Sequence, residues 1–169
     1  MNKETTCCFT GPRPKRLPMN GNEYSAEIAA LKVEIRRAVN EAYDDGFRFF
    51  MNGMAEGFDV FSAEAVLELK KEHPDAALIA VLPYSKAPQN HSAGICRRIE
   101  NILLGADFVY SLGEEHVLGC EHRRNAYMVE NSSRIIGYYN GLSSGTAHCW
   151  NLALEKGLET VNLYEYDQT

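Results

Sequence analysis

The stretch from residue 134 to 150, RIIGYYNGLSSGTAHCW, constrains the fold more than any other part of this chain. It starts with an apolar run typical of a buried β-strand, containing Ile135, Ile136, Tyr138 and Tyr139. The run breaks at Asn140-Gly141, crosses a loop of small residues, and enters a helical segment that continues to about Lys156. This order of strand, loop and helix is typical of one unit of a parallel α/β sheet.

The loop in this stretch has the features of an anion-binding site. The first backbone N–H groups of a helix have no partner inside the helix, and the helix dipole places partial positive charge beside them. Gly141 and Gly145 have no Cβ, so a ligand can approach the backbone closely. Hydroxyl groups that can add hydrogen bonds come from Ser143, Ser144 and Thr146. We therefore predict phosphate binding at this loop.

The rest of the chain alternates short apolar runs with segments of helical periodicity. Strands are predicted at 5–10, 47–52, 76–82, 107–112 and 160–164. The intervening segments predict helices at 24–45, 94–104 and 121–131, and one that follows the turn at 53–59 and runs to about residue 72. Without a repeat or linker, this pattern predicts a single α/β domain over residues 1–169, with a mostly parallel sheet of about six strands and right-handed crossovers.

The overall composition indicates which partners and which cellular compartment to expect. A net charge of −6 with pI near 5.4 predicts that nucleic acid is an unfavourable partner, and favours small molecules or proteins. Five cysteines form an odd set without a CxxC pair, which is typical of reduced thiols in a cytosol. The sequence has neither a signal peptide nor an apolar run of about 18 residues, so we expect a cytoplasmic protein without a membrane partner.

Two further predicted strands end on a glycine, at Thr10-Gly11 and Asn52-Gly53. Because ligands of parallel sheets bind outside the carboxyl ends of the strands, we expect Gly11, Gly53 and Gly141 to border one cleft. Arg13 follows the first strand and can grip a phosphate with two hydrogen bonds. Glu56 and Asp59 would repel a phosphate, so we expect them near the ribose hydroxyls of a nucleotide; helix capping by Asp59 is the open alternative.

Several other side chains have both a possible functional role and a simpler structural one. The loop at 83–92 is long enough to act as a flap, where Tyr84 could stack on a base or pack against Pro83. The spacing of His116, Cys120 and His122 matches no common zinc pattern, so we predict neither a metal nor a cofactor. Cys149 is interpreted as a small buried cysteine rather than a nucleophile paired with His148.

Three segments, CCFTGPRP, NGMAEGFDVFSAEAVLELKKEHP and RRNAYMVENSSRIIGYYNGLSSGTAHC, make the chain resemble the YpsA family of the SLOG superfamily, which also contains LOG-type phosphoribohydrolases and DprA/Smf proteins. The resemblance covers nearly the whole chain and implies a Rossmann-like three-layer sandwich with a nucleotide or nucleotide-derived ligand. It adds Arg124 and Asn125 to the expected site, whereas Arg123 is interpreted as part of a solvated basic turn. The residue patterns and the resemblance together predict the following ligand-binding residues: Gly11, Arg13, Gly53, Gly57, Asp59, Arg124, Asn125, Gly141, Ser144, Gly145 and Thr146.

The sequence departs from the family pattern where catalysis is concerned. Pro12 stands where the family usually has the histidine of its FTGHRP motif. LOG-type enzymes carry a glutamate in a GTxxE motif, and this chain has Cys149 at that place. The leading hypothesis is therefore nucleotide binding in a sensing or regulatory role. The alternatives are a nucleoside-monophosphate N-glycosidase with Glu56 or Asp59 as the catalytic carboxylate, and a DprA-like protein or DNA interaction module; self-association into a homo-oligomer is left open.

Overall fold

A six-stranded, all-parallel sheet forms the centre of the computed structural model, which describes residues 1–164. The strands are β1 (Thr6–Thr10), β2 (Phe49–Asn52), β3 (Ala77–Leu82), β4 (Phe108–Ser111), β5 (Arg134–Gly137) and β6 (Glu159–Asn162). They lie in the order β4-β3-β2-β1-β5-β6, and every neighbouring pair is parallel. The predicted α/β fold with about six strands is confirmed, and the sheet is parallel throughout.

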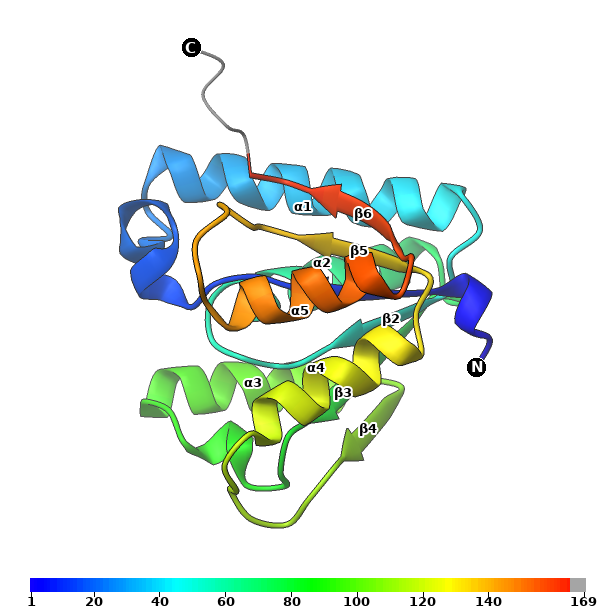
Figure 1. Cartoon of the computed structure of the whole chain (residues 1–169). Helices are drawn as coiled ribbons and strands as arrows, with labels where there is room; N and C mark the ends of the chain where they lie inside the picture. The colour runs from blue at the N-terminus through cyan, green and yellow to red at the C-terminus, as the bar shows by residue number, and fades with distance from the viewer. Residues whose placement is uncertain (165–169) are drawn as a thin grey trace.

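Helices cover both faces of this sheet. The α-helices of the described chain are α1 (Ala26–Asp44), α2 (Phe58–Glu72), α3 (Ala93–Gly105), α4 (Cys120–Glu130) and α5 (Gly145–Glu155). Helix α2 contacts both α1 and α3, while α4 contacts α5. In Figure 1, α4 and α5 lie in front of the sheet and the other three helices lie behind it. The molecule is therefore a three-layer Rossmann-like sandwich.

Two apolar cores, one on each face, explain why these segments fold as they do. Cys7 and Phe9 of β1 point into the core beneath α1 and α2, whereas Cys8 points into the core beneath α4 and α5. Strand β3 is apolar along its whole length because both of its faces are covered. Helix α1 buries one stripe of side chains with helical spacing, as predicted: Ile28, Leu31, Ile35, Ala38, Val39 and Ala42.

Strand β5 is shorter than the apolar run predicts, because a side chain pairs with the backbone of Tyr139 in place of a neighbouring strand. The strand ends at Gly137, although the N–H of Tyr138 still donates to the Thr10 carbonyl at 3.1 Å. The N–H of Tyr139 donates to Oδ1 of Asn162 at 3.0 Å, and Nδ2 of Asn162 donates to the Tyr139 carbonyl at 2.9 Å. The two tyrosines still pack on opposite faces of the sheet, Tyr138 against one core and Tyr139 against the other.

The winding direction of the chain reverses between β1 and β5. From β1 the chain passes through α1 to β2 on one side, whereas from β5 it passes through α5 to β6 on the other side. The two helices consequently cover opposite faces, which leaves a crevice outside the carboxyl ends of β1 and β5. The loops that follow β1, β2 and β5 lie at this edge, because these three strands are neighbours.

None of the helices in residues 1–164 has both the length and the apolar character needed to cross a lipid bilayer.

Candidate ligand-binding cleft

A cavity of about 440 Å³ opens at this crevice. Its walls come from the loop after β1, the start of α2, the first turns of α4 and the N-terminus of α5. The predicted site residues that line it are Gly11, Arg13, Asp59, Arg124, Asn125, Ser144, Gly145 and Thr146. We call this cavity the cleft. Its volume is in the range typical of small-molecule sites, about 300–1,000 Å³.

The other predicted residues lie beside the cleft. Gly53 lines an adjoining recess of about 70 Å³, which shares Arg13 and Arg124 with the cleft. Gly57 is the N-cap of α2 in a conformation with φ 98°, and a Cβ there would come within 2.7 Å of the Pro12 carbonyl oxygen. Gly141 lies in the loop before α5 and does not line either cavity. These glycines shape the loops around the cleft.

The N-terminus of α5 points open backbone donors at the cleft. Ser144 is the N-cap, and its hydroxyl accepts a hydrogen bond from the N–H of Ala147 at 3.1 Å. Within residues 1–164, the N–H groups of Gly145 and Thr146 have no protein acceptor. A Cβ built on Gly145 would meet nothing within 4 Å, so the space in front of these donors is open. The helix end can therefore receive an anion.

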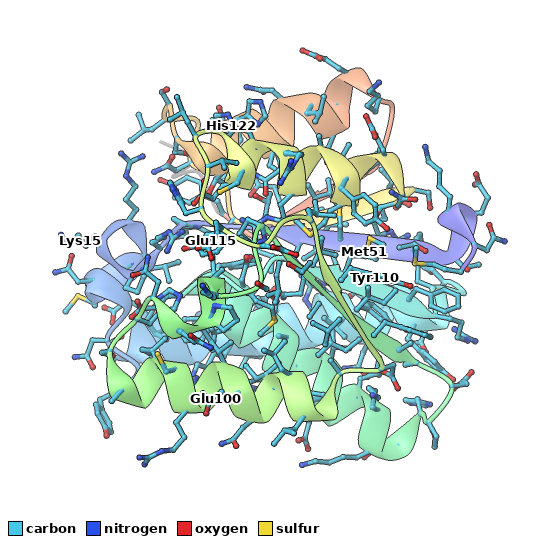
Figure 2. The ribbon with its side chains drawn as sticks, turned by 90° about the horizontal axis from the view of Figure 1, so that it is seen from below. Lys15, Met51, Glu100, Tyr110, Glu115 and His122 are labelled. Carbon is cyan, nitrogen blue, oxygen red and sulfur yellow. The ribbon has the colours of Figure 1, made fainter. Side chains whose placement is uncertain are left out.

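A basic segment forms another side of the cleft. Arg13, Lys15 and Arg16 surround the short 3₁₀ helix η2 (Pro14–Arg16) and line the cleft. Arg16 donates to the Ser143 carbonyl at 3.0 Å, which links this segment to the loop before α5. Among the residues described, none of the three makes an ion pair with a carboxylate. Figure 2 shows Lys15 and His122, which also lines the cleft, at the same end of the molecule.

Arg124 is a buried arginine held by neutral acceptors. Its guanidinium donates to the Gly53 carbonyl and, at 2.9 Å, to Oδ1 of Asn125. Gly53 allows this approach, since a Cβ there would lie 2.5 Å from Nη1 of Arg124. Burial is the main reason that the pKa of the guanidinium falls below its usual value, and the nearby Asp59 opposes that effect. An arginine without a direct carboxylate partner remains available to an anion.

Asp59 is the more buried of the two carboxylates that line the cleft. Only 6% of this residue is exposed, and its Oδ2 accepts the N–H of Ala55 at 3.1 Å. Burial raises the pKa of the Asp59 carboxyl, while Arg124, the Ala55 N–H and Arg13 act in the opposite direction. Asp59 is not the cap of α2, because Gly57 holds that position and the helix has no side-chain cap.

The second catalytic candidate lies elsewhere. Glu56 does not line the cleft, and its carboxylate lies 3.6 Å from Nδ1 of His91 in the loop after β3. Of the two candidates, only Asp59 could reach a ligand held in the cleft. The N-glycosidase alternative accordingly stays a prediction that depends on Asp59.

The loop at 83–92 closes the recess beside the cleft. Pro83, Tyr84 and His91 are among the residues that line this recess. Tyr84 is 8% exposed, and its ring meets the edge of the His116 ring with centroids 5.5 Å apart. Tyr84 is thus largely covered by protein.

Histidine and cysteine side chains near the cleft take separate roles. The rings of His122 and His148 stack with centroids 4.0 Å apart, so His148 faces a neighbouring helix rather than Cys149. Cys149 is fully buried, and burial raises the pKa of its thiol to about 11. A thiol in this state is a core residue at neutral pH.

Sequence reasoning missed Lys15, Arg16, Glu121 and His122, all of which line the cleft. The run PRPKR after the first strand was the available signal, because its basic residues follow directly on a predicted binding turn. With Arg13 and Arg124, the cleft has four basic residues and only two carboxylates, Asp59 and Glu121.

Comparison with known proteins identifies the family. The sequence model of the YpsA family, described as the YspA SLOG family, matches residues 7–167. UPF0398 proteins from Bacillus thuringiensis strain Al Hakam and Bacillus cereus strain Q1 are each 24% identical over 159 residues, covering 93% of this chain and 86% of theirs.

Solved structures of DNA processing protein A share the fold. The Streptococcus pneumoniae protein, DprA, matches with a TM-score of 0.68 at 16% identity, over 98% of this chain and 52% of that one. The Helicobacter pylori protein matches with a TM-score of 0.67 at 17% identity, over 98% of this chain and 68% of that one. This chain therefore spans about half the length of the first of these proteins.

These neighbours correct one expectation. We predicted from the net charge of −6 that nucleic acid is an unfavourable partner. That prediction was wrong, because the Helicobacter pylori protein of the same fold is described by its single-stranded DNA binding mode. Net charge averages over the whole chain, whereas a nucleic acid meets only the charges at one surface.

Proposed function

Because the chain belongs to the YpsA family of SLOG proteins, we propose that its cleft binds a nucleotide unit through the phosphate group. The observation that carries the proposal is the convergence of two kinds of donor on one cavity. The open N–H groups of Gly145 and Thr146 lie on one side, and the guanidinium of Arg13 lies on the other. Backbone donors and a planar guanidinium are both well suited to phosphate oxygens.

The carboxylate of Asp59 favours a nucleotide over a bare phosphate. It lies in the same cavity as Arg13 and Gly145 but is anchored by the N–H of Ala55. An anion beside a phosphate is unfavourable unless it accepts hydrogen bonds from the ligand, as carboxylates do from ribose hydroxyls in dinucleotide-binding folds. The cleft volume of about 440 Å³ leaves room for such a sugar.

The test compares two glycines that differ only in where they lie. Gly145 and Gly94 both lie in the first turn of a helix, and at both a Cβ would meet nothing within 4 Å. Gly145→Glu places a carboxylate at the phosphate position, whereas Gly94→Glu places one at the start of α3, outside the cleft. Binding is measured by calorimetry and thermal shift with AMP, ADP, ADP-ribose, ribose 5-phosphate and inorganic phosphate.

We expect at least one nucleotide to raise the melting temperature of the wild type, and Gly145→Glu to abolish this effect. Gly94→Glu should leave it unchanged. The proposal fails if no compound binds, if inorganic phosphate binds as tightly as every nucleotide, or if the two variants lose affinity equally.

A second candidate, binding of single-stranded DNA, is supported by the basic segment Arg13–Arg16 at the cleft and by the fold shared with DprA. In this case the nucleotide unit belongs to a DNA strand, and further phosphates of that strand lie along Lys15 and Arg16.

Fluorescence anisotropy with a single-stranded oligo-dT separates the candidates. Lys15→Gln should weaken oligonucleotide binding, reduce its salt dependence by about one phosphate contact and spare AMP. Equal affinity of the wild type and of Lys15→Gln for the oligonucleotide would remove this candidate.

A further inference from the structure

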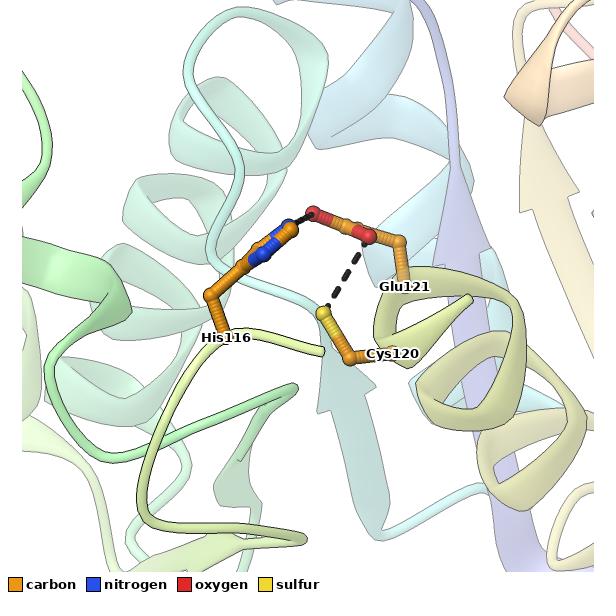
Figure 3. A group of neighbouring side chains, drawn as sticks. All are labelled: His116, Cys120 and Glu121. Atoms are coloured by element: carbon orange, nitrogen blue, oxygen red, sulfur yellow. Dashed lines mark hydrogen bonds and ion pairs between the residues drawn. The ribbon is translucent and has the colours of Figure 1, made fainter. Parts of the chain in front are cut away.

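A cluster of metal-ligating side chains lies beside the cleft, and one of its members, Glu121, lines both the cleft and the adjoining recess. His116 comes from the loop after β4, and Cys120 and Glu121 form the first two positions of α4. One potential ligand atom from each of the three lies within 4.8 Å of the others. Figure 3 shows the imidazole, the thiol and the carboxylate turned towards a common centre.

We propose that His116, Cys120 and Glu121 bind a divalent transition-metal ion of the zinc type. One nitrogen, one sulfur and one oxygen donor form a set that zinc accepts, whereas magnesium and calcium favour oxygen ligands alone. A tetrahedral zinc ion holds its ligand atoms about 3.4 Å apart, given metal–ligand bonds of about 2.0–2.3 Å. Nε2 of His116 lies 3.8 Å from Oε1 of Glu121, and Sγ of Cys120 lies 3.2 Å from Oε2. Only small side-chain movements are needed to close the site.

The surroundings hold these groups in place. The imidazole of His116 packs edge-on against the ring of Tyr84, with centroids 5.5 Å apart. Cys120 is 1% exposed, and its thiol donates to the Glu121 carboxylate.

The negative charge of the proposed ligands favours a bound cation, although the N-terminus of α4 lies beside them. The N-terminus of α4 carries a partial positive charge of about half a unit, which opposes a metal ion. On metal binding the Cys120 thiol releases its proton to solvent and binds as a thiolate. The thiolate and the Glu121 carboxylate together supply two negative charges, so the ligands outweigh the dipole. Three protein ligands leave a fourth coordination position open, as in zinc sites that bind water or a substrate.

Spacing along the sequence groups His116 and Cys120 with His122, and that set matches no common zinc pattern. In the structure His122 instead stacks on His148. Glu121 takes its place because the first turn of α4 directs residues 120 and 121 to the same side as the His116 loop.

The experiment uses the full chain without a purification tag, in reducing buffer after removal of metal by a chelator. Zinc affinity is measured by competition with a chromophoric chelator, and cobalt binding is followed by absorbance. We expect one ion per chain, and a thiolate-to-cobalt charge-transfer band that reports the Cys120 ligand. Absence of stoichiometric zinc binding, or cobalt binding without this band, overturns the proposal.

Variants locate the ion. His116→Ala changes a side chain that is 59% exposed, so the fold should be kept, which an unchanged melting temperature of the metal-free protein would verify. It should weaken zinc binding by about 100-fold or more, because losing a ligand costs more than losing a residue that only hydrogen-bonds to a ligand. Cys120→Ser should remove the cobalt band.

His122→Ala and Cys96→Ser are the matched controls and should bind zinc as the wild type does. Loss of binding in either control, or retention in His116→Ala, places the ion elsewhere and contradicts the proposal.

Discussion

Two buried arginines at opposite ends of the sheet have opposite surroundings. Arg134 begins β5, and its guanidinium donates to Asp45 at 2.8 Å and to Glu159 at 2.9–3.0 Å. Arg124 faces the cleft, where its direct acceptors are the Gly53 carbonyl and the Asn125 amide. Burial lowers the pKa of both, but the two carboxylates bring the pKa of Arg134 above its usual value, while that of Arg124 stays below it.

The difference separates a structural arginine from one that is available to a ligand. The carboxylates of Asp45 and Glu159 neutralise the charge of Arg134 within the protein, so this arginine needs no anion from a ligand. Arg124 has the carboxylates of Asp59 and Glu121 nearby as counter-charges, but neither forms an ion pair with it among residues 1–164. A buried cation with incomplete compensation gains more from an incoming anion than a compensated one does.

The largest effect is expected for Arg124→Met. It removes the buried cation and leaves Asp59 without its main counter-charge, so affinity for the best-binding nucleotide should fall about 100-fold. Arg123→Met is the control, because the neighbouring Arg123 is exposed and donates to the Leu112 carbonyl outside the cleft. Calorimetry on both variants measures the effect. Equal affinities would mean that Arg124 is structural, like Arg134.

Arg134→Met should show the reverse pattern. It removes charge-assisted hydrogen bonds and should lower the free energy of unfolding by about 2 kcal/mol. The loss is limited because the side chains of Asp45 and Glu159 are 56% and 58% exposed and regain water. Nucleotide affinity should stay within about twofold of the wild type. Urea unfolding and calorimetry give the two values, and a large loss of affinity at constant stability would contradict the contrast.

The smallest effect concerns pH. The folded pKa of Asp59 is raised above the unfolded value, so the folded state holds its proton more tightly. The destabilising contribution of Asp59 therefore appears as pH rises from about 4 through the raised pKa. Asp59→Asn should remove this contribution and be more stable than the wild type above that range.

Glu23 provides the opposite case for the same measurement. Hydrogen bonds from Arg98 are the main reason that its pKa falls to about 2, so its stabilising contribution is lost as pH falls from about 4.5 towards 2. Glu23→Gln should lower stability at neutral pH and flatten the acid limb. Thermal melts from pH 3 to 8 distinguish the two. Parallel pH profiles for Asp59→Asn and Glu23→Gln would contradict the assigned directions.

Most of the fold was predictable because its signals are local. Helix α1 repeats apolar residues every three or four positions, and β3 is apolar throughout because helices cover both faces. The end of β5 was not predictable, since it depends on a hydrogen bond between Tyr139 and Asn162, which lie 23 positions apart in the chain. A pairing of this kind leaves no trace near Tyr138 and Tyr139.

The site was predictable where it depends on strand ends. Gly11, Arg13 and Gly145 follow strands or open a helix, and topology alone brings these positions together. The direction of side chains is not contained in topology, which is why Lys15 and Glu121 were missed. The charge argument against nucleic acid failed for a related reason, because a total charge contains no information about position.

The amide of Asn162 marks the point at which the chain leaves the sheet towards the cleft. It bonds to both backbone groups of Tyr139 and accepts the N–H of Tyr164, so one side chain joins the segments that follow β5 and β6. The segment that follows Tyr139 leads to Ser144 and Gly145, which line the cleft. A residue that does not line the cleft is therefore hydrogen-bonded to the start of the loop that carries the open N–H groups.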